Sequence, residues 1–138
     1  LWNGRKRRDT AAAESLAEEL DRFADLMKEV LEITNTRGEI TDHNRAAEVK
    51  RLCRRNTNRF LTLIESGAYR RLGCDLQQEI DRKLRVVHYA PGSTVQAINL
   101  IEAGIDSGSF AVKARNEFAT AIDGVRDLAV RLRLHAAR

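Results

Sequence analysis

The C-terminal part of the chain reads SFAVKARNEFATAIDGVRDLAVRLRLHAAR, residues 109–138. Apolar residues recur in it at alternating steps of three and four, at Ala111, Ala114, Phe118, Ala121, Val125, Leu128 and Leu132. This spacing puts all of these side chains on one face of an α-helix. Small residues in that face allow close approach of a neighbouring helix. The stretch therefore predicts a long last helix, from about Ser109 onward, that packs against another helix.

The first half of the chain carries two further helical patterns. The first begins at Thr10, a suitable N-cap residue, and should end near Gly38. The second begins near Thr41 or Asp42 and should end at Ser66-Gly67. The apolar positions of the first pattern are Ala13, Leu16, Leu20, Phe23, Met27 and Val30.

A third pattern covers about residues 68–89, with a break at Gly73-Cys74-Asp75, where Asp75 and Gln78 resemble a capping box. A short fourth helix is expected between Ser93 and Gly108. No segment alternates between apolar and polar residues as a half-buried strand does. The sequence thus predicts an all-α fold, an antiparallel helical bundle of four long helices plus one short helix.

The composition agrees with one folded domain at residues 10–138, preceded by a basic flank at residues 1–9. The chain has 138 residues and is 43% hydrophobic, which is enough apolar material for a core. It contains one proline, and an all-β fold needs more turns than this composition indicates. No run of 18 apolar residues is present, so the chain shows no membrane span of its own. Two cysteines without a CxxC pattern favour a reducing, cytoplasmic setting.

The second helix carries a stripe of basic residues opposite its apolar face. We call this set the basic stripe: Lys50, Arg51, Arg54, Arg55 and Arg59. No acidic residue lies between residues 50 and 59, so these charges repel one another unless something anionic offsets them. The acidic first helix, a partner protein, an anionic lipid surface or a nucleic acid could each do so. The stripe lacks the interleaved aromatic residues that stack on bases, which weakens the nucleic-acid interpretation.

A polar residue interrupts the apolar face of the same helix. Asn56 falls in the middle of this face, so we expect either a buried polar contact that fixes helix register or an amide at the core edge that binds water.

The N-terminal flank combines a tryptophan with a basic cluster: Trp2, Arg5, Lys6, Arg7 and Arg8. Tryptophan favours the membrane interface, and basic residues favour the cytosolic side of a span. The flank therefore fits the juxtamembrane part of an anchor that lies upstream, or else a disordered basic tail, a nucleic-acid arm or a cleavage site.

Histidine and cysteine positions provide weaker indications. In a bundle of five alternating helices, His43, His88 and His135 would meet at one end, where they could bind a metal ion or respond to pH. The spacing Arg82-x5-His88 is similar to that of helical ribonucleases of the HEPN family. Separation along the helices predicts that Cys53, in the core, and Cys74, near the helix break, are free thiols.

No catalytic constellation, cofactor motif or metal-ligand motif is present, and no small-molecule substrate is indicated. The sequence favours a non-enzymatic protein-interaction or scaffold module that binds a protein partner or itself. It also fits the cytosolic part of a membrane-anchored protein. The alternatives are a nucleic-acid-binding domain that uses the basic stripe, and a small helical ribonuclease or metal-binding protein.

Overall fold

The chain folds as an all-α bundle, as predicted. The computed structural model describes residues 2–35, 39–66, 69–82 and 108–137. Its elements are α1 (Trp2–Ile33), α2 (His43–Ile64), the short 3-10 helix η1 (Tyr69–Arg71), a helical segment at residues 74–82 and α4 (Gly108–Ala137). The described residues contain no strand, only one isolated bridge between Thr34 and Ile40. The short helix expected between Ser93 and Gly108 lies outside the described residues.

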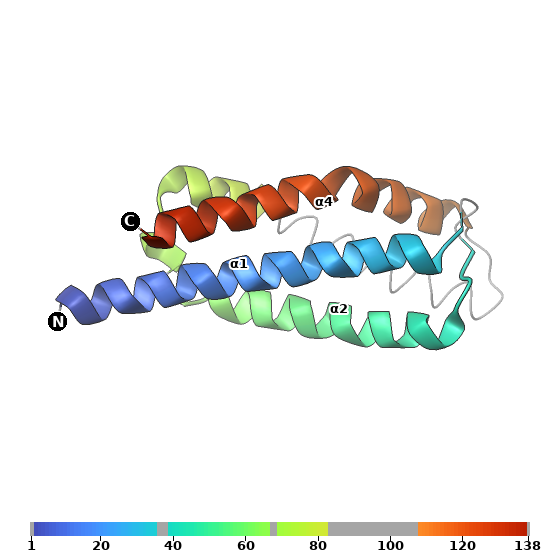
Figure 1. Ribbon diagram of the computed structural model, residues 1–138, viewed down its shortest axis with the longest axis horizontal. Helices are drawn as coiled ribbons and strands as arrows, with labels where there is room; N and C mark the ends of the chain where they lie inside the picture. The colour runs from blue at the N-terminus through green and yellow to red at the C-terminus, as the bar shows by residue number, and fades with distance from the viewer. Residues whose placement is uncertain (1, 36–38, 67–68, 83–107, 138) are drawn as a thin grey trace.

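Helix α1 lies between α2 and α4, and both of these run antiparallel to it (Figure 1). The reversal between α1 and α2 is compact, because the backbone N–H of Thr41 donates to the carbonyl of Ile33 at 2.8 Å. Asp42 then caps α2, as predicted, and its side chain accepts a hydrogen bond from the backbone N–H of Arg45 at 3.0 Å. This reversal fixes which faces of α1 and α2 meet.

The first helix starts earlier than the sequence indicated. It begins at Trp2, so Thr10 lies inside the helix and does not cap it. The hydroxyl of Thr10 lies 3.5 Å from the carbonyl oxygen of Ala136, near the end of α4. The helix starts earlier because the basic residues before Thr10 are good helix formers and no proline interrupts them. The N-terminal end of α1 consequently extends past the end of α4 (Figure 1).

The core forms along the predicted apolar faces. Leu16, Leu20 and Phe23 of α1 are almost completely buried, and so are Leu128 and Leu132 of α4. Burial of apolar surface at about 25 cal/mol per Å² makes these faces the main source of stability. The side chains of Ala111, Ala114 and Phe118, in the N-terminal half of the predicted face of α4, lie outside the described part of the structure.

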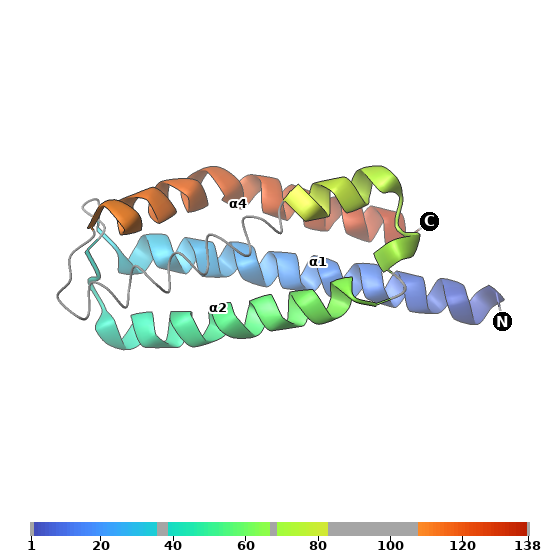
Figure 2. The same ribbon diagram turned by 180° about the vertical axis from the view of Figure 1, so that it is seen from behind.

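The third helical pattern, predicted over about residues 68–89, is interrupted at residues 72–73, next to the predicted break at Gly73-Cys74-Asp75, and residues 83–89 of it lie outside the described residues. The helix η1 ends at Arg71, and a new helical segment starts at residue 74 beside the C-terminal half of α4 (Figure 2). An ion pair between Glu79 and Arg131 joins the two. The expected capping box differs from the structure, because the amide of Gln78 contacts the sulfur of Cys74 while Gln77 caps the carbonyls of Arg70 and Leu72.

Candidate functional site

A groove runs along the junction of α1 and α2. It is open to solvent and has a volume of about 600 Å³, within the range of ordinary binding pockets. Helix α1 contributes Glu19, Arg22, Asp25, Leu26 and Glu29, and α2 contributes Leu52, Arg55, Asn56 and Arg59. We call this feature the interhelix groove. A second hollow of about 370 Å³ continues it toward Ser15 and Thr62, and the two hollows share Glu19 and Arg59.

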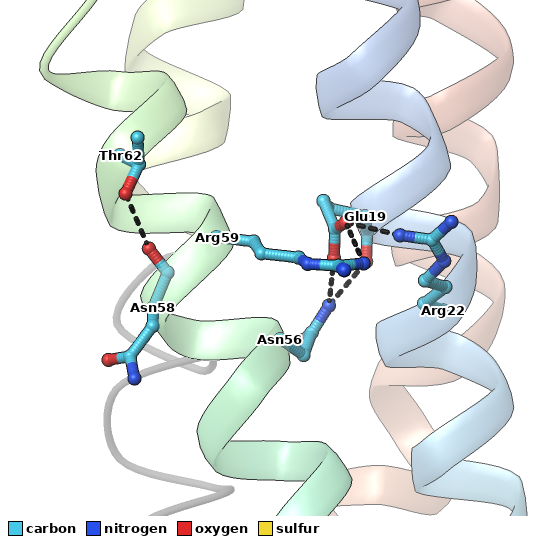
Figure 3. A network of polar contacts seen from close by, with 6 residues as sticks. All are labelled: Glu19, Arg22, Asn56, Asn58, Arg59 and Thr62. Carbon is cyan, nitrogen blue, oxygen red and sulfur yellow. Dashed lines mark hydrogen bonds and ion pairs between the residues drawn. The ribbon is translucent and has the colours of Figure 1, made fainter.

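A buried carboxylate and a buried amide form the polar centre of the groove. Glu19 and Asn56 are each only 4% exposed. The Nδ2 of Asn56 donates to the backbone carbonyl of Glu19 at 3.0 Å and to Oε2 of its side chain at 2.8 Å (Figure 3). Of the two alternatives for Asn56, the structure shows the buried polar contact, and its partner is Glu19 of α1. This contact fixes the register between α1 and α2.

Two arginines offset the charge of Glu19. Arg22 donates from Nη1 to Oε1 of the carboxylate at 2.5 Å, and the Nη1 of Arg59 lies 3.7 Å from the same oxygen. Arg59 extends across from α2 to α1 in this contact (Figure 3). A buried carboxylate is costly unless it is paired and hydrogen-bonded, and Glu19 is both. The Oδ1 of Asn56 is buried without a hydrogen-bond partner, so the network leaves one acceptor unsatisfied.

The other two acidic residues of the groove are also occupied. Asp25 accepts from Arg126 of α4 at 2.7 Å, and Glu29 pairs with Arg45 of α2. Hydrogen bonding to Glu29 raises the pKa of Arg45, so this guanidinium stays charged. Each carboxylate that lines the groove therefore has an arginine from the same chain.

The basic stripe does not behave as a single surface. Arg51 pairs with Glu48 on its own helix, at 2.6 Å, which lowers the pKa of the Glu48 carboxyl. Arg59 is bound to Glu19, and Lys50 is half-buried. Arg54 and Arg55 are exposed, and no described carboxylate forms an ion pair with either. Of these two, Arg55 lines the interhelix groove and Arg54 does not.

The N-terminal flank is helical rather than a separate tail. Arg7 and Arg8 are exposed on the projecting end of α1, while the side chains of Trp2, Arg5 and Lys6 lie outside the described part of the structure. Asp9, the next residue, binds Arg71 at 2.7 Å and so anchors the base of the projection. No described helix is both long enough and apolar enough to cross a membrane.

The predicted grouping of histidines is wrong. His43 is the first residue of α2 and His135 lies in the last turn of α4, and these two helix ends are at opposite ends of the bundle (Figure 1). The prediction assumed that α1 and the last helix run parallel, whereas they run antiparallel. His88, and with it the Arg82-x5-His88 pair, lies outside the described residues. Across the residues that the structure describes, no group of three or more metal-ligating side chains comes together.

Both cysteines are free thiols, as predicted. Cys74 is exposed at the start of the helical segment after η1, and Cys53 is buried on the inner face of α2. Burial raises the pKa of Cys53 to about 12, with a smaller contribution from the charge of Glu29. Cys53 is therefore an unreactive core residue.

A surface on the exposed side of α4 was not predicted from the sequence. Among the described residues, the large hydrophobic side chains exposed to solvent are Val130, at 53%, and Leu134, at 57%. Asp123 and Asp127 lie on the same face, because the four positions are separated by steps of four, three and four. We call these four residues the α4 patch. The same helical spacing that revealed the buried face of α4 could have revealed this one.

Comparison of the chain with family models, with curated proteins and with solved structures finds no significant match.

Proposed function

We propose that the chain is a non-enzymatic protein-interaction module whose interhelix groove takes an amphipathic helix from a protein partner. The observation that carries the proposal is that the carboxylates of the groove have ion-pair partners while one of its arginines has none among the described residues. All three of its carboxylates are paired within the chain, whereas Arg55 has no carboxylate partner among the described residues. A bound helix that supplies an acidic residue would complete the site.

The apolar part of the groove supports the same occupant. Leu52 is half-buried and Leu26 is 7% exposed, and both line the groove next to its charged residues. Helices dock in such grooves through apolar residues at steps of three and four, with charges beside them. The preferred occupant is therefore a helix that carries an apolar stripe and adjacent acidic residues.

Nucleic-acid binding through the basic stripe is the second candidate, since Arg54 and Arg55 are exposed and lack described ion-pair partners. The two candidates make different demands on these neighbouring residues. A phosphate backbone would be contacted by both arginines, because binding scales with the number of cations presented. Of the two, a helix in the groove would contact Arg55 and not Arg54, since Arg54 does not line it.

A matched pair of variants tests the proposal. The probe is a synthetic helix-forming peptide with leucines at steps of three and four and glutamates beside them. We expect fluorescence polarisation to show binding that Arg55→Glu weakens about tenfold or more and that Arg54→Glu leaves within about twofold.

The same two variants are then titrated with a single-stranded oligonucleotide at several salt concentrations. Absence of peptide binding, or equal loss for both variants, contradicts the groove as the binding site. Equal loss of oligonucleotide binding together with a steep salt dependence would establish the nucleic-acid candidate instead.

The projecting end of α1 supports an additional role at an anionic membrane surface, as the cytosolic part of a membrane-anchored protein. Arg7 and Arg8 are exposed there, beyond the ion pair of Asp9 with Arg71. We expect co-sedimentation with vesicles that contain phosphatidylserine, and loss of this binding in Arg7→Glu/Arg8→Glu. Equal binding to neutral vesicles would contradict this role.

A further inference from the structure

The α4 patch has the chemistry that the interhelix groove lacks. It presents two exposed apolar side chains, Val130 and Leu134, and two exposed carboxylates, Asp123 and Asp127. Neither carboxylate forms an ion pair within the described part of the chain, and Arg131, the cation near Asp127, is already bound to Glu79. The groove in turn presents apolar side chains and an arginine without a described carboxylate partner.

We propose that the helix bound in the interhelix groove is α4 of a second copy of this chain, docked through the α4 patch. This inference rests on the function proposed above and names the partner. Complementary charge and the match of apolar surface favour a second copy over an unrelated helix, because both halves of the contact occur on the same sequence. Val130 and Leu134 are also one helical turn apart, so they form a contiguous exposed apolar pair, and contiguous apolar patches mark interaction sites.

The dimensions of the two surfaces agree. From Glu19 to Glu29 the groove follows ten residues of α1, which is about 15 Å at the rise of an α-helix. From Asp123 to Leu134 the patch follows eleven residues of α4, about 16 Å. Three turns of helix thus cover the length of the groove.

The order of residues also fixes a direction. Along α2 the apolar Leu52 comes first, followed by Arg55 and Arg59, whereas along α4 the carboxylates precede Val130. A docked α4 that runs antiparallel to α2 places Val130 over Leu52. The same register places Asp127 opposite Arg55.

It also places Asp123 opposite Arg59, whose side chain is 43% exposed above Glu19. Docking in the reverse direction would set the carboxylates against the apolar end of the groove and lose both ion pairs.

The contact joins two different surfaces, so each copy offers one groove and one patch. Such heterologous contacts close into a ring or continue into an open chain of subunits. The mass of the wild-type protein should therefore rise with concentration in sedimentation equilibrium. Val130→Glu/Leu134→Glu removes the patch and Arg55→Glu damages the groove, and all three positions are exposed, so the fold should persist.

The decisive measurement mixes the two variants. Each variant alone should self-associate at least about tenfold more weakly than the wild type. Together they should form a complex of one copy of each, because the patch of the Arg55→Glu chain fits the groove of the Val130→Glu/Leu134→Glu chain. Arg54→Glu is the matched control, and it should assemble as the wild type does. A charge exchange, Asp127→Arg with Arg55→Asp in one chain, should restore assembly that either change alone weakens.

Several results would overturn the inference. They are a wild-type protein that stays monomeric up to its solubility limit, a mixture that forms no complex, and an Arg54→Glu control that loses assembly. Failure of the proposed function is measured separately, with the acidic peptide and the Val130→Glu/Leu134→Glu variant, whose groove is intact. If that variant binds the peptide while the wild type remains monomeric, the groove is a binding site and a second copy is not its occupant.

Discussion

The two interfaces of α1 differ in kind. Against α4, the packing is apolar: Ala17 and Ala24 of α1 are fully buried in the same core cluster as Leu128 and Leu132 of α4. Against α2, the contact includes the buried Glu19 and Asn56 and leaves the interhelix groove at its edge. The comparison shows how one helix can contribute both to stability and to a binding groove. Apolar and small residues close one side and supply stability, while a polar pair on the other side fixes register and leaves space for a ligand.

The largest effect should come from the closed interface. Leu132→Ala removes a fully buried side chain and leaves a cavity, so we expect a loss of about 2–5 kcal/mol in the free energy of unfolding. Leu134→Ala is the matched control, because Leu134 lies two residues further on the same helix and is 57% exposed. Its loss should stay below about 0.5 kcal/mol. Urea unfolding measures both, and similar losses for the two variants would contradict the assignment of the buried face.

The second prediction concerns the polar interface. Asn56→Leu removes both hydrogen bonds to Glu19 and leaves a buried carboxylate with fewer donors, so we expect a loss of about 1–3 kcal/mol. The double variant Glu19→Leu/Asn56→Leu removes the charge as well and should recover most of that loss or exceed the wild-type stability. If the double variant is as unstable as the sum of the two single changes, the pair is not coupled as the structure indicates.

The buried faces were predictable from the sequence, and the contacts between helices were not. The spacing of Leu16, Leu20 and Phe23 indicates a face without any knowledge of its partner. The pairing of Asn56 with Glu19 depends on the relative register of two helices, which their separate patterns do not contain. The position of His135 depends on the direction of α4, and periodicity is the same in both directions.

The same reasoning explains the error at the N-terminus and the missed surface. Thr10 has a side chain that can cap a helix, but the residues before it also favour a helix. The helix therefore continues through Thr10 to Trp2 instead of beginning at Thr10. The α4 patch contains only two apolar residues, Val130 and Leu134, so its spacing is a weaker signal than the seven-residue apolar face. Packing against α1 decides which face of α4 is buried in the core.

The third prediction uses the pH dependence of stability to test whether water reaches Cys53 on the inner face of α2. Burial raises the pKa of Cys53 from 9.0 to about 12, so the folded state holds the thiol proton over a range where the unfolded state releases it. The stabilisation is complete below pH 9 and declines between pH 9 and 12. At pH 10 the loss should be about 1.4 kcal/mol.

Denaturant unfolding at pH 8 and pH 10 measures this loss, and Cys53→Ala should remove it while Cys74→Ala should not. Tyr69, whose pKa is raised by burial and by its hydrogen bond to Asp81, adds a further decline in both variants above pH 10. Native-state alkylation provides an independent check, since only the exposed Cys74 should react rapidly. Rapid alkylation of both thiols would show that water reaches the inner face of α2.

The smallest effect should come from the ion pairs on the outer edge of the α1–α4 interface. Arg126 binds Asp25 at 2.7 Å, but Asp25 is 69% exposed, so water screens most of the attraction. A double-mutant cycle with Arg126→Ala and Asp25→Ala should therefore give a coupling energy below about 1 kcal/mol. The coupling should also fall in high salt. A larger, salt-independent coupling would mean that charge rather than apolar packing holds α4 on α1, and the two sides of α1 would then differ less than the buried residues indicate.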